Sequence, residues 1–109
     1  MENTMQFKTQ QDTLIVYFKG EIDHQNTLLY RQTLIDYLDE HHTPIIILDF
    51  KDVSFIDSSG IGMILGRYNQ VSKYGGHIYF SQLSEPTRRL FELSGLLRLK
   101  STREVGVCV

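Results

Sequence analysis

Two adjacent serines between an aspartate and a glycine are the residues of this sequence best suited to a chemical event. Ser58 and Ser59 follow Asp57 in the stretch FIDSSGIGMILG. The apolar residues after them recur at helical spacing, which places both serines at a helix N-terminus, where free backbone N–H groups and the helix dipole favour an anion. A phosphate on either serine would add about −1.5 to −2 charges at pH 7. The pattern therefore indicates a phosphorylation switch, although a simple helix cap would use the same residue types.

Three glycines interrupt the helix that these serines begin. Gly60, Gly62 and Gly66 each cost about 1 kcal/mol of helix stability relative to alanine. We expect Gly60 and Gly62 to bare the backbone of the first turn so that another protein can approach closely. Ile61, between them, is expected to present an apolar side chain to that partner. For Gly66 we expect close packing against the sheet.

Three aspartates suggest a competing function. Asp49, Asp52 and Asp57 fall near the predicted carboxyl end of a central strand, where open α/β sheets bind ligands. The alternative reading is a small α/β enzyme or a receiver-like domain that accepts a phosphoryl group beside magnesium. A receiver-like domain needs an acidic pair after its first strand and a lysine after a late strand, and this sequence has neither. Loop and capping roles are therefore favoured for these carboxylates.

Other catalytic patterns are absent from the sequence. No serine lies in a G-x-S-x-G elbow, no Walker lysine follows the GIG stretch, and the four histidines lack a metal-ligand spacing. We therefore expect no enzyme activity, no metal and no cofactor. Cys108 is the only cysteine, so it has no internal disulfide partner, and this usage fits a reducing cytosol.

The segments that must position these residues alternate between strand and helix patterns. Met5 to Gln10 and Thr13 to Lys19 read as an antiparallel hairpin. A helix is expected over residues 25–40, capped by Asp23 or Asn26, with an apolar stripe of Leu28, Leu29, Leu34, Ile35 and Leu38.

The later segments continue the alternation. Residues 44–50 read as a strand covered on both faces because its aliphatic run is nearly continuous. Residues 51–56 are expected to connect it to the helix that ends near Tyr74. A strand over 77–82 and a helix over 84–95, with Ser84 at the N-cap and Gly95 beyond the end, follow. The tail, residues 96–109, is expected to hold a short strand and a last partial helix. The fold class is thus α/β.

Composition limits the possible partners. The chain has 109 residues, 41% of them hydrophobic, and a formal net charge of −2. These values predict one globular domain without the basic field that nucleic-acid binding needs. The aliphatic run Ile45 to Leu48 is too short to span a membrane, and residues 1–10 lack the basic-then-apolar pattern of a signal peptide. We expect an intracellular, cytoplasmic protein.

The segment DVSFIDSSGIGMILGRY, Asp52 to Tyr68, resembles the signature of the STAS-domain anti-sigma-factor antagonists. The pattern is most similar to the sporulation member that controls the forespore sigma factor. FKGEID, IIILDF and RRLFELSGL match further segments of that family in the same order. The resemblance implies a single STAS domain over residues 1–109, with a mixed sheet, an N-terminal hairpin and about four helices.

The resemblance also implies a function and a site. The unphosphorylated protein would bind an anti-sigma factor that is also a serine kinase, in its nucleotide-bound form, and release the sigma factor. That kinase would phosphorylate Ser58, and a serine phosphatase would reverse the modification. Asp23, Asp57, Ser59, Gly60, Ile61 and Gly62 would flank the phosphorylated residue and contact the partner.

Overall fold

The computed structural model describes residues 2–106 as a sheet with helices packed on it. The elements are β1 (Thr4–Gln10), β2 (Thr13–Ile22), α1 (His24–His41), β3 (Ile45–Ile56), α2 (Ser58–Ser72), β4 (His77–Ser81), α3 (Glu85–Ser94), the 3₁₀ turn η1 (Leu96–Arg98) and β5 (Thr102–Val105).

The sheet has the strand order β1-β2-β3-β4-β5. β1 and β2 form an antiparallel hairpin in which Gln10 pairs with Thr13 across a two-residue turn. The other neighbours run parallel, with α1, α2 and α3 lying on the connections between them. This arrangement confirms the predicted α/β class and the mixed sheet with an N-terminal hairpin.

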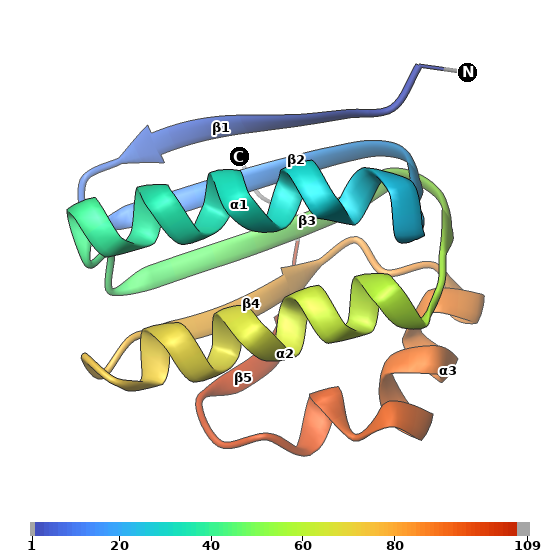
Figure 1. Cartoon of the computed structure of the whole chain (residues 1–109). Coiled ribbons are helices and arrows are strands. Elements are labelled where there is room, and N and C mark those ends of the chain that lie inside the picture. The colour runs from blue at the N-terminus through green and yellow to red at the C-terminus, as the bar shows by residue number, and fades with distance from the viewer. Residues whose placement is uncertain (1, 107–109) are drawn as a thin grey trace.

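All three helices pack on one face of the sheet (Figure 1). Tyr30 of α1 lies 5.7 Å from Phe18 of β2, and Phe91 of α3 lies 5.4 Å from Phe50 and 5.0 Å from Phe80, measured between ring centroids. Each fully buried phenylalanine of this kind stabilises the fold by roughly 1.5–3 kcal/mol. The core therefore sits between the helices and the alternate strand residues that face them.

The prediction that β3 is covered on both faces is wrong, because the helices cover only one of its faces. Ile46, Leu48 and Phe50 face the helical layer and are buried, whereas Ile45 and Ile47, on the opposite face, are only half-buried. A continuous aliphatic run does not reveal that only one of its two faces meets helices.

Beyond Phe50, β3 continues through the segment predicted as a connector and ends at Ile56. Its register with β2 shifts between Tyr17 and Lys19 and again between Gly20 and Glu21. Such bulges insert extra residues into one strand, which lets the twelve residues of β3 stay paired with the ten residues of β2.

The chain after α3 differs from the prediction in its helix content. Gly95 adopts a left-handed conformation, with φ 83°, and ends α3 as expected. The predicted partial helix is the single turn η1, and the predicted strand is β5. The part of the chain that the structure describes thus holds three α-helices and one 3₁₀ turn, rather than about four helices. Cys108 lies outside the described residues.

Candidate functional site

The candidate site forms where two strands deliver two helices to the same edge of the sheet. Ile22 and Ile56 are paired at the ends of the parallel strands β2 and β3. The next residues, Asp23 and Asp57, are the N-caps of α1 and α2, and the Asp57 amide donates to the Ile22 carbonyl at 3.3 Å. Both helices therefore begin side by side (Figure 1).

The two cap carboxylates are already engaged by their own helices. Asp57 Oδ1 accepts hydrogen bonds from the Ser59 amide at 2.9 Å and the Gly60 amide at 3.3 Å, which confirms its predicted capping role. Asp23 Oδ1 accepts from the Asn26 amide at 2.9 Å, so Asp23 rather than Asn26 caps α1. Burial, and then the charge of Asp23, raise the pKa of the nearby Tyr30 hydroxyl, which stays a neutral phenol.

The two serines occupy different environments. Ser58 is the first residue of α2 and is exposed. Ser59 is half-buried and turns toward α1, where its hydroxyl oxygen lies 3.4 Å from Nδ1 of His24. Ser58 is therefore the more accessible of the two hydroxyl groups to an enzyme arriving from solvent.

Gly60 and Ile61 serve the core rather than an exposed surface. A Cβ on Gly60 would lie 2.6 Å from Cγ1 of Ile56 and 3.1 Å from Cγ2 of Ile22. The Ile61 side chain is buried, so the expectation of an exposed apolar contact at Ile61 is wrong. The expectation that Gly60 clears a path for a partner is also wrong. The space beside Gly60 is filled by the side chains of Ile56 and Ile22, at the ends of β3 and β2.

Gly62 and Gly66 lack this constraint. A Cβ on either residue would meet no atom within 4 Å. The expected packing of Gly66 against the sheet is therefore wrong. Gly62 is exposed, one turn after Ser58, so its missing side chain leaves open space on the surface of α2.

Two hollows lie on either side of the α2 N-terminus. One, of about 290 Å³, lies between α1 and α2 and is lined by His24, Thr27, Leu28, Arg31, Ser59, Gly62 and Met63. The other, of about 160 Å³, joins the end of β3 to the start of α3 and is lined by Ser54, Phe55, Ile56, Ser84, Pro86, Thr87 and Leu90.

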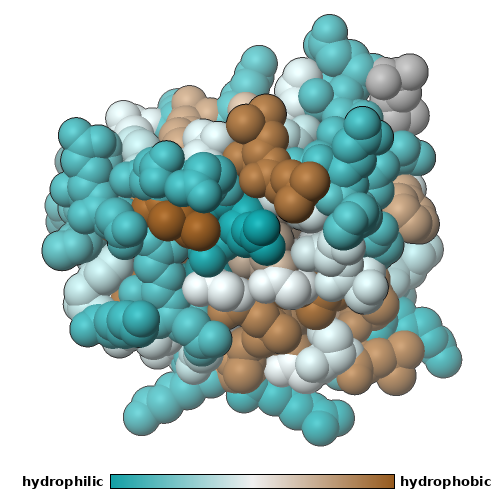
Figure 2. All heavy atoms as spheres, in the orientation of Figure 1, coloured by the Kyte–Doolittle hydropathy of each residue, from teal (hydrophilic) through white to brown (hydrophobic). Residues whose placement is uncertain are grey.

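Apolar side chains reach the surface at both hollows. Leu28 is 54% exposed and Phe55 is 49% exposed. Figure 2 shows apolar patches among polar side chains on the helical face. The sequence prediction assigned Leu28 and Leu29 to the buried stripe of α1, which is wrong. The buried residues of that helix are Thr27, Tyr30, Leu34 and Leu38.

A polar seam joins α1 to α2 further along both helices. Nε of Arg67 donates to Oε1 of Gln70 at 2.9 Å, and Nε2 of Gln70 donates to the Ile35 carbonyl and to Oδ1 of Asp39. Burial, followed by the charge of Arg31, lowers the pKa of Arg67. Sequence reasoning missed Arg31 and Arg67 because only the packing of α1 against α2 brings them together.

The three aspartates of the alternative prediction do not form a cluster. Asp49 is buried, and its carboxylate accepts from the Ser81 hydroxyl at 2.8 Å and from the Lys51 amide at 3.1 Å. Asp52 is an exposed residue of β3, and Asp57 caps α2. At about 3.3 Å per residue along a strand, the eight residues from Asp49 to Asp57 span up to about 26 Å. Across residues 2–106, no three His, Cys, Asp or Glu side chains are grouped to hold a metal ion.

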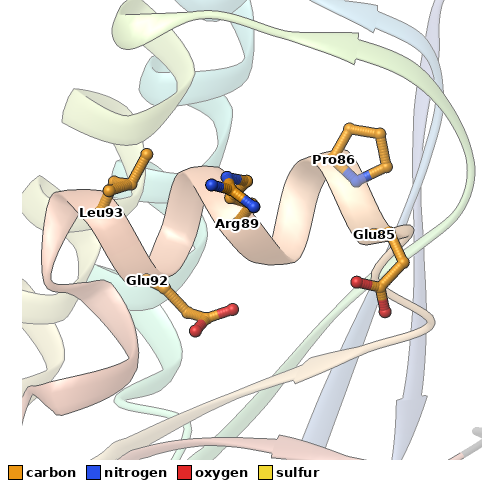
Figure 3. Close-up of a pocket in the computed structure, with 5 residues that line it drawn as sticks. All are labelled: Glu85, Pro86, Arg89, Glu92 and Leu93. Atoms are coloured by element: carbon orange, nitrogen blue, oxygen red, sulfur yellow. The ribbon is translucent and has the colours of Figure 1, made fainter.

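A third hollow, of about 620 Å³, lies on the outer face of α3 (Figure 3). Its lining residues, Glu85, Pro86, Arg89, Glu92 and Leu93, include none of the predicted site residues. Within the described part of the chain, no helix has both the length and the apolar composition needed to cross a membrane.

Comparison with known proteins agrees with the fold. The family model for the STAS domain matches residues 4–105. The chain is 35% identical to an anti-sigma F factor antagonist of Paenibacillus polymyxa, over 79% of this chain and 74% of that protein. It is 33% identical to the anti-sigma-B factor antagonist of Bacillus subtilis, over 88% of this chain and 86% of that protein.

Solved structures show the same fold. The unphosphorylated form of the anti-sigma factor antagonist SpoIIAA superposes with a TM-score of 0.79 at 23% identity, covering 96% of this chain and 90% of that chain. The phosphorylated form of the Bacillus protein SpoIIAA gives 0.76 at 26% identity, covering 94% and 91%. The chain therefore belongs to the STAS domain family and is related, within it, to the anti-sigma factor antagonists.

Proposed function

We propose that this chain is an anti-sigma factor antagonist that binds its anti-sigma factor through the surface around Ser58, and that phosphorylation of Ser58 switches the binding off. The exposed position of Ser58 at the start of α2 carries the proposal. The neighbouring Asp23, Asp57, Ser59 and Gly62 complete the contact surface, and the buried Gly60 and Ile61 hold its backbone in place.

The partners follow from the same assignment. The anti-sigma factor also acts as the serine kinase, in a nucleotide-bound form, and a serine phosphatase restores the unmodified protein. A solved phosphorylated form of SpoIIAA, at 26% identity, supports modification as the regulatory step. Binding, phosphorylation and dephosphorylation take place in the cytoplasm, and neither a membrane nor a nucleic acid takes part directly.

The local geometry explains how one phosphoryl group acts without refolding the protein. The α2 N-terminus favours an anion, so the modified helix keeps its structure. A partner that covers the phosphate must remove its charge from water, and the carboxylates of Asp23 and Asp57 already lie at this edge. A loss of about 1.4 kcal/mol in binding free energy is tenfold in affinity, and an uncompensated buried charge costs more than that. The switch therefore acts on the interface.

Substitution of the two serines tests the proposal. Ser58→Asp should weaken binding of the anti-sigma factor at least tenfold in titration calorimetry, because it places a fixed negative charge in the interface. Ser58→Ala should bind and resist phosphorylation, and Ser59→Ala is the matched control that should still be modified. A phosphate located on Ser59 by mass spectrometry, or unchanged affinity of Ser58→Asp, would contradict the assignment.

A catalytic alternative predicts a different outcome. An enzyme based on Asp49, Asp52 and Asp57 should turn over ATP with magnesium when the purified chain is incubated alone. The separation of these carboxylates along β3 gives this alternative no support. We expect no turnover and no modification until the kinase is added, which the same mass-spectrometric measurement records.

A further inference from the structure

The hollow between α1 and α2 carries a charge that its surroundings do not balance. Its lining includes two basic side chains, His24 and Arg31, and no carboxylate. Arg31 is exposed and takes part in neither of the two ion pairs found among residues 2–106.

A second arginine adds to this charge. Arg67 is 8% exposed, and its Nη1 atom has no hydrogen-bond partner in the described structure. Asp39, whose charge acts on Arg67, already accepts a hydrogen bond from Gln70. The seam between the two helices therefore holds two neighbouring guanidinium groups whose charges repel each other.

The hollow also offers apolar contact and room for a backbone. Leu28 is more than half exposed at its rim, and Gly62 on the facing helix has no side chain and no neighbour where a Cβ would stand. A chain segment laid over Gly62 can therefore reach Leu28 and Arg31 together.

Ser59 and Gly62 belong both to this hollow and to the proposed binding surface around Ser58. A protein that covers Ser58 closely enough to be expelled by a phosphate will also cover the mouth of the hollow. Covering Arg31 without a counter-charge would cost several kcal/mol, whereas a carboxylate can form a short, bidentate hydrogen-bonded pair with a guanidinium.

We propose that this hollow receives an acidic side chain of the anti-sigma factor, whose carboxylate pairs with Arg31 while an adjacent apolar group packs on Leu28. The inference rests on the proposed function and adds to it a contact on α1, separate from the helix that carries the phosphorylated serine. Partner recognition is then divided, with α2 carrying the switch and α1 a determinant of specificity.

The outer face of α3 provides a matched control (Figure 3). It presents the same two residue types, Arg89 and the 79% exposed Leu93, beside a hollow. There, however, Glu85 and Glu92 accompany the arginine, so the surface needs no external carboxylate.

The test uses the unphosphorylated full chain and two purified probes, the anti-sigma F factor of Paenibacillus polymyxa and the anti-sigma-B factor of Bacillus subtilis, each with nucleotide. By titration calorimetry, Arg31→Glu and Leu28→Ser should each weaken binding at least tenfold, and Arg31→Lys should stay within about threefold of the wild type. Arg31→Glu should also reduce the salt dependence of binding. Arg89→Glu and Leu93→Ser should bind like the wild type, and thermal unfolding should be unchanged in all variants because these side chains are exposed.

The outcomes separate the two proposals. Wild-type affinity in Arg31→Glu and Leu28→Ser, with weakened binding in Ser58→Asp, would overturn the α1 contact and leave the proposed function standing. Weakened binding in Arg89→Glu and Leu93→Ser alone would place the contact on α3 and would also overturn the proposed α1 contact. A loss in Arg31→Lys equal to that in Arg31→Glu would overturn the charge pairing. Failure of the wild type to bind either probe would contradict the proposed function and the inference together.

Discussion

Ser58 and Ser59 are adjacent in the chain, yet the fold treats them differently. The hydroxyl of Ser59 lies beside His24 on α1, whereas Ser58 is exposed at the first position of α2. The difference arises because consecutive residues of a helix point about 100° apart. The resemblance to the STAS antagonists implies modification of Ser58, and the greater exposure of Ser58 is consistent with that proposal.

Gly60 and Gly62 of α2 also differ, in the effect that an added side chain should have on stability. Gly60→Ala should lower the free energy of unfolding by about 1–3 kcal/mol, because its Cβ would overlap Ile56 by more than helix propensity can offset. Gly62→Ala meets no atom and should raise it by up to about 1 kcal/mol. Urea unfolding of both variants measures the contrast, and equal effects would contradict the packing argument.

At the scale of elements, the junction of β3 and α2 depends on one carboxylate oxygen. Asp57→Ala removes the acceptor of two amide hydrogen bonds and should destabilise the protein by about 0.5–2 kcal/mol. Asp57→Asn keeps an acceptor oxygen and should retain most of the stability.

Urea unfolding of Asp57→Ala and Asp57→Asn distinguishes the hydrogen bond from the charge. An equal loss in both variants would mean that the negative charge at the helix N-terminus, and not the acceptor, stabilises α2. If Asp57→Asn instead retains its stability, binding measurements on it report the effect of the Asp57 charge at the proposed interface without a change in the helix.

Local patterns predicted most element types but not their limits or environments. Ser84 and Gly95 mark the start and the end of α3, as their residue types predicted. Such caps can be predicted from sequence because they act on neighbouring backbone groups. The extension of β3 to Ile56 depends on bulges against β2, and the clash at Gly60 involves Ile22, 38 positions earlier in the sequence. Leu28 and Leu29 satisfied the apolar pattern but fall outside the face that meets the sheet.

At the scale of the whole molecule, a surface network ties the last strand to the body of the protein. Arg88 of α3 donates from Nε and Nη2 to the carboxylate of Glu104 in β5, a strand of only four residues. The hydrogen bond from Arg88 lowers the pKa of Glu104. A carboxyl group with a lowered folded-state pKa contributes stability above its unfolded pKa, and this contribution is lost as the pH falls through the folded pKa.

Glu104→Gln should therefore lower the melting temperature at pH 7, modestly because the pair is partly exposed. The difference between variant and wild type should shrink as the pH falls below about 4.5, the ordinary range of a glutamate. Calorimetric melting curves from pH 7 to pH 3 measure it. A difference that stays constant over this range would assign the effect to packing.

Sequence composition and topology agree at this largest scale. The strand and helix order implied a hairpin followed by parallel crossovers, and the five-stranded sheet has that form. The position of all three helices on one face, and the spread of Asp49 and Asp57 along β3, could not be read from the chain because both depend on how the strands are paired. The alternative based on the aspartates failed at that step.

The two glycines in the first turn of α2 affect how readily that turn opens, and so the rate of the proposed phosphorylation of Ser58. We predict that the first turn of α2 opens locally when the proposed kinase engages Ser58. Low helix propensity at Gly60 and Gly62 lowers the free energy of that opening. Gly62→Ala should slow amide hydrogen exchange in this turn by up to about fivefold, the equivalent of about 1 kcal/mol, and slow phosphorylation with it. If amide hydrogen exchange were unchanged and phosphorylation still slower, the added methyl group would be acting on the contact with the kinase and not on the opening of the turn.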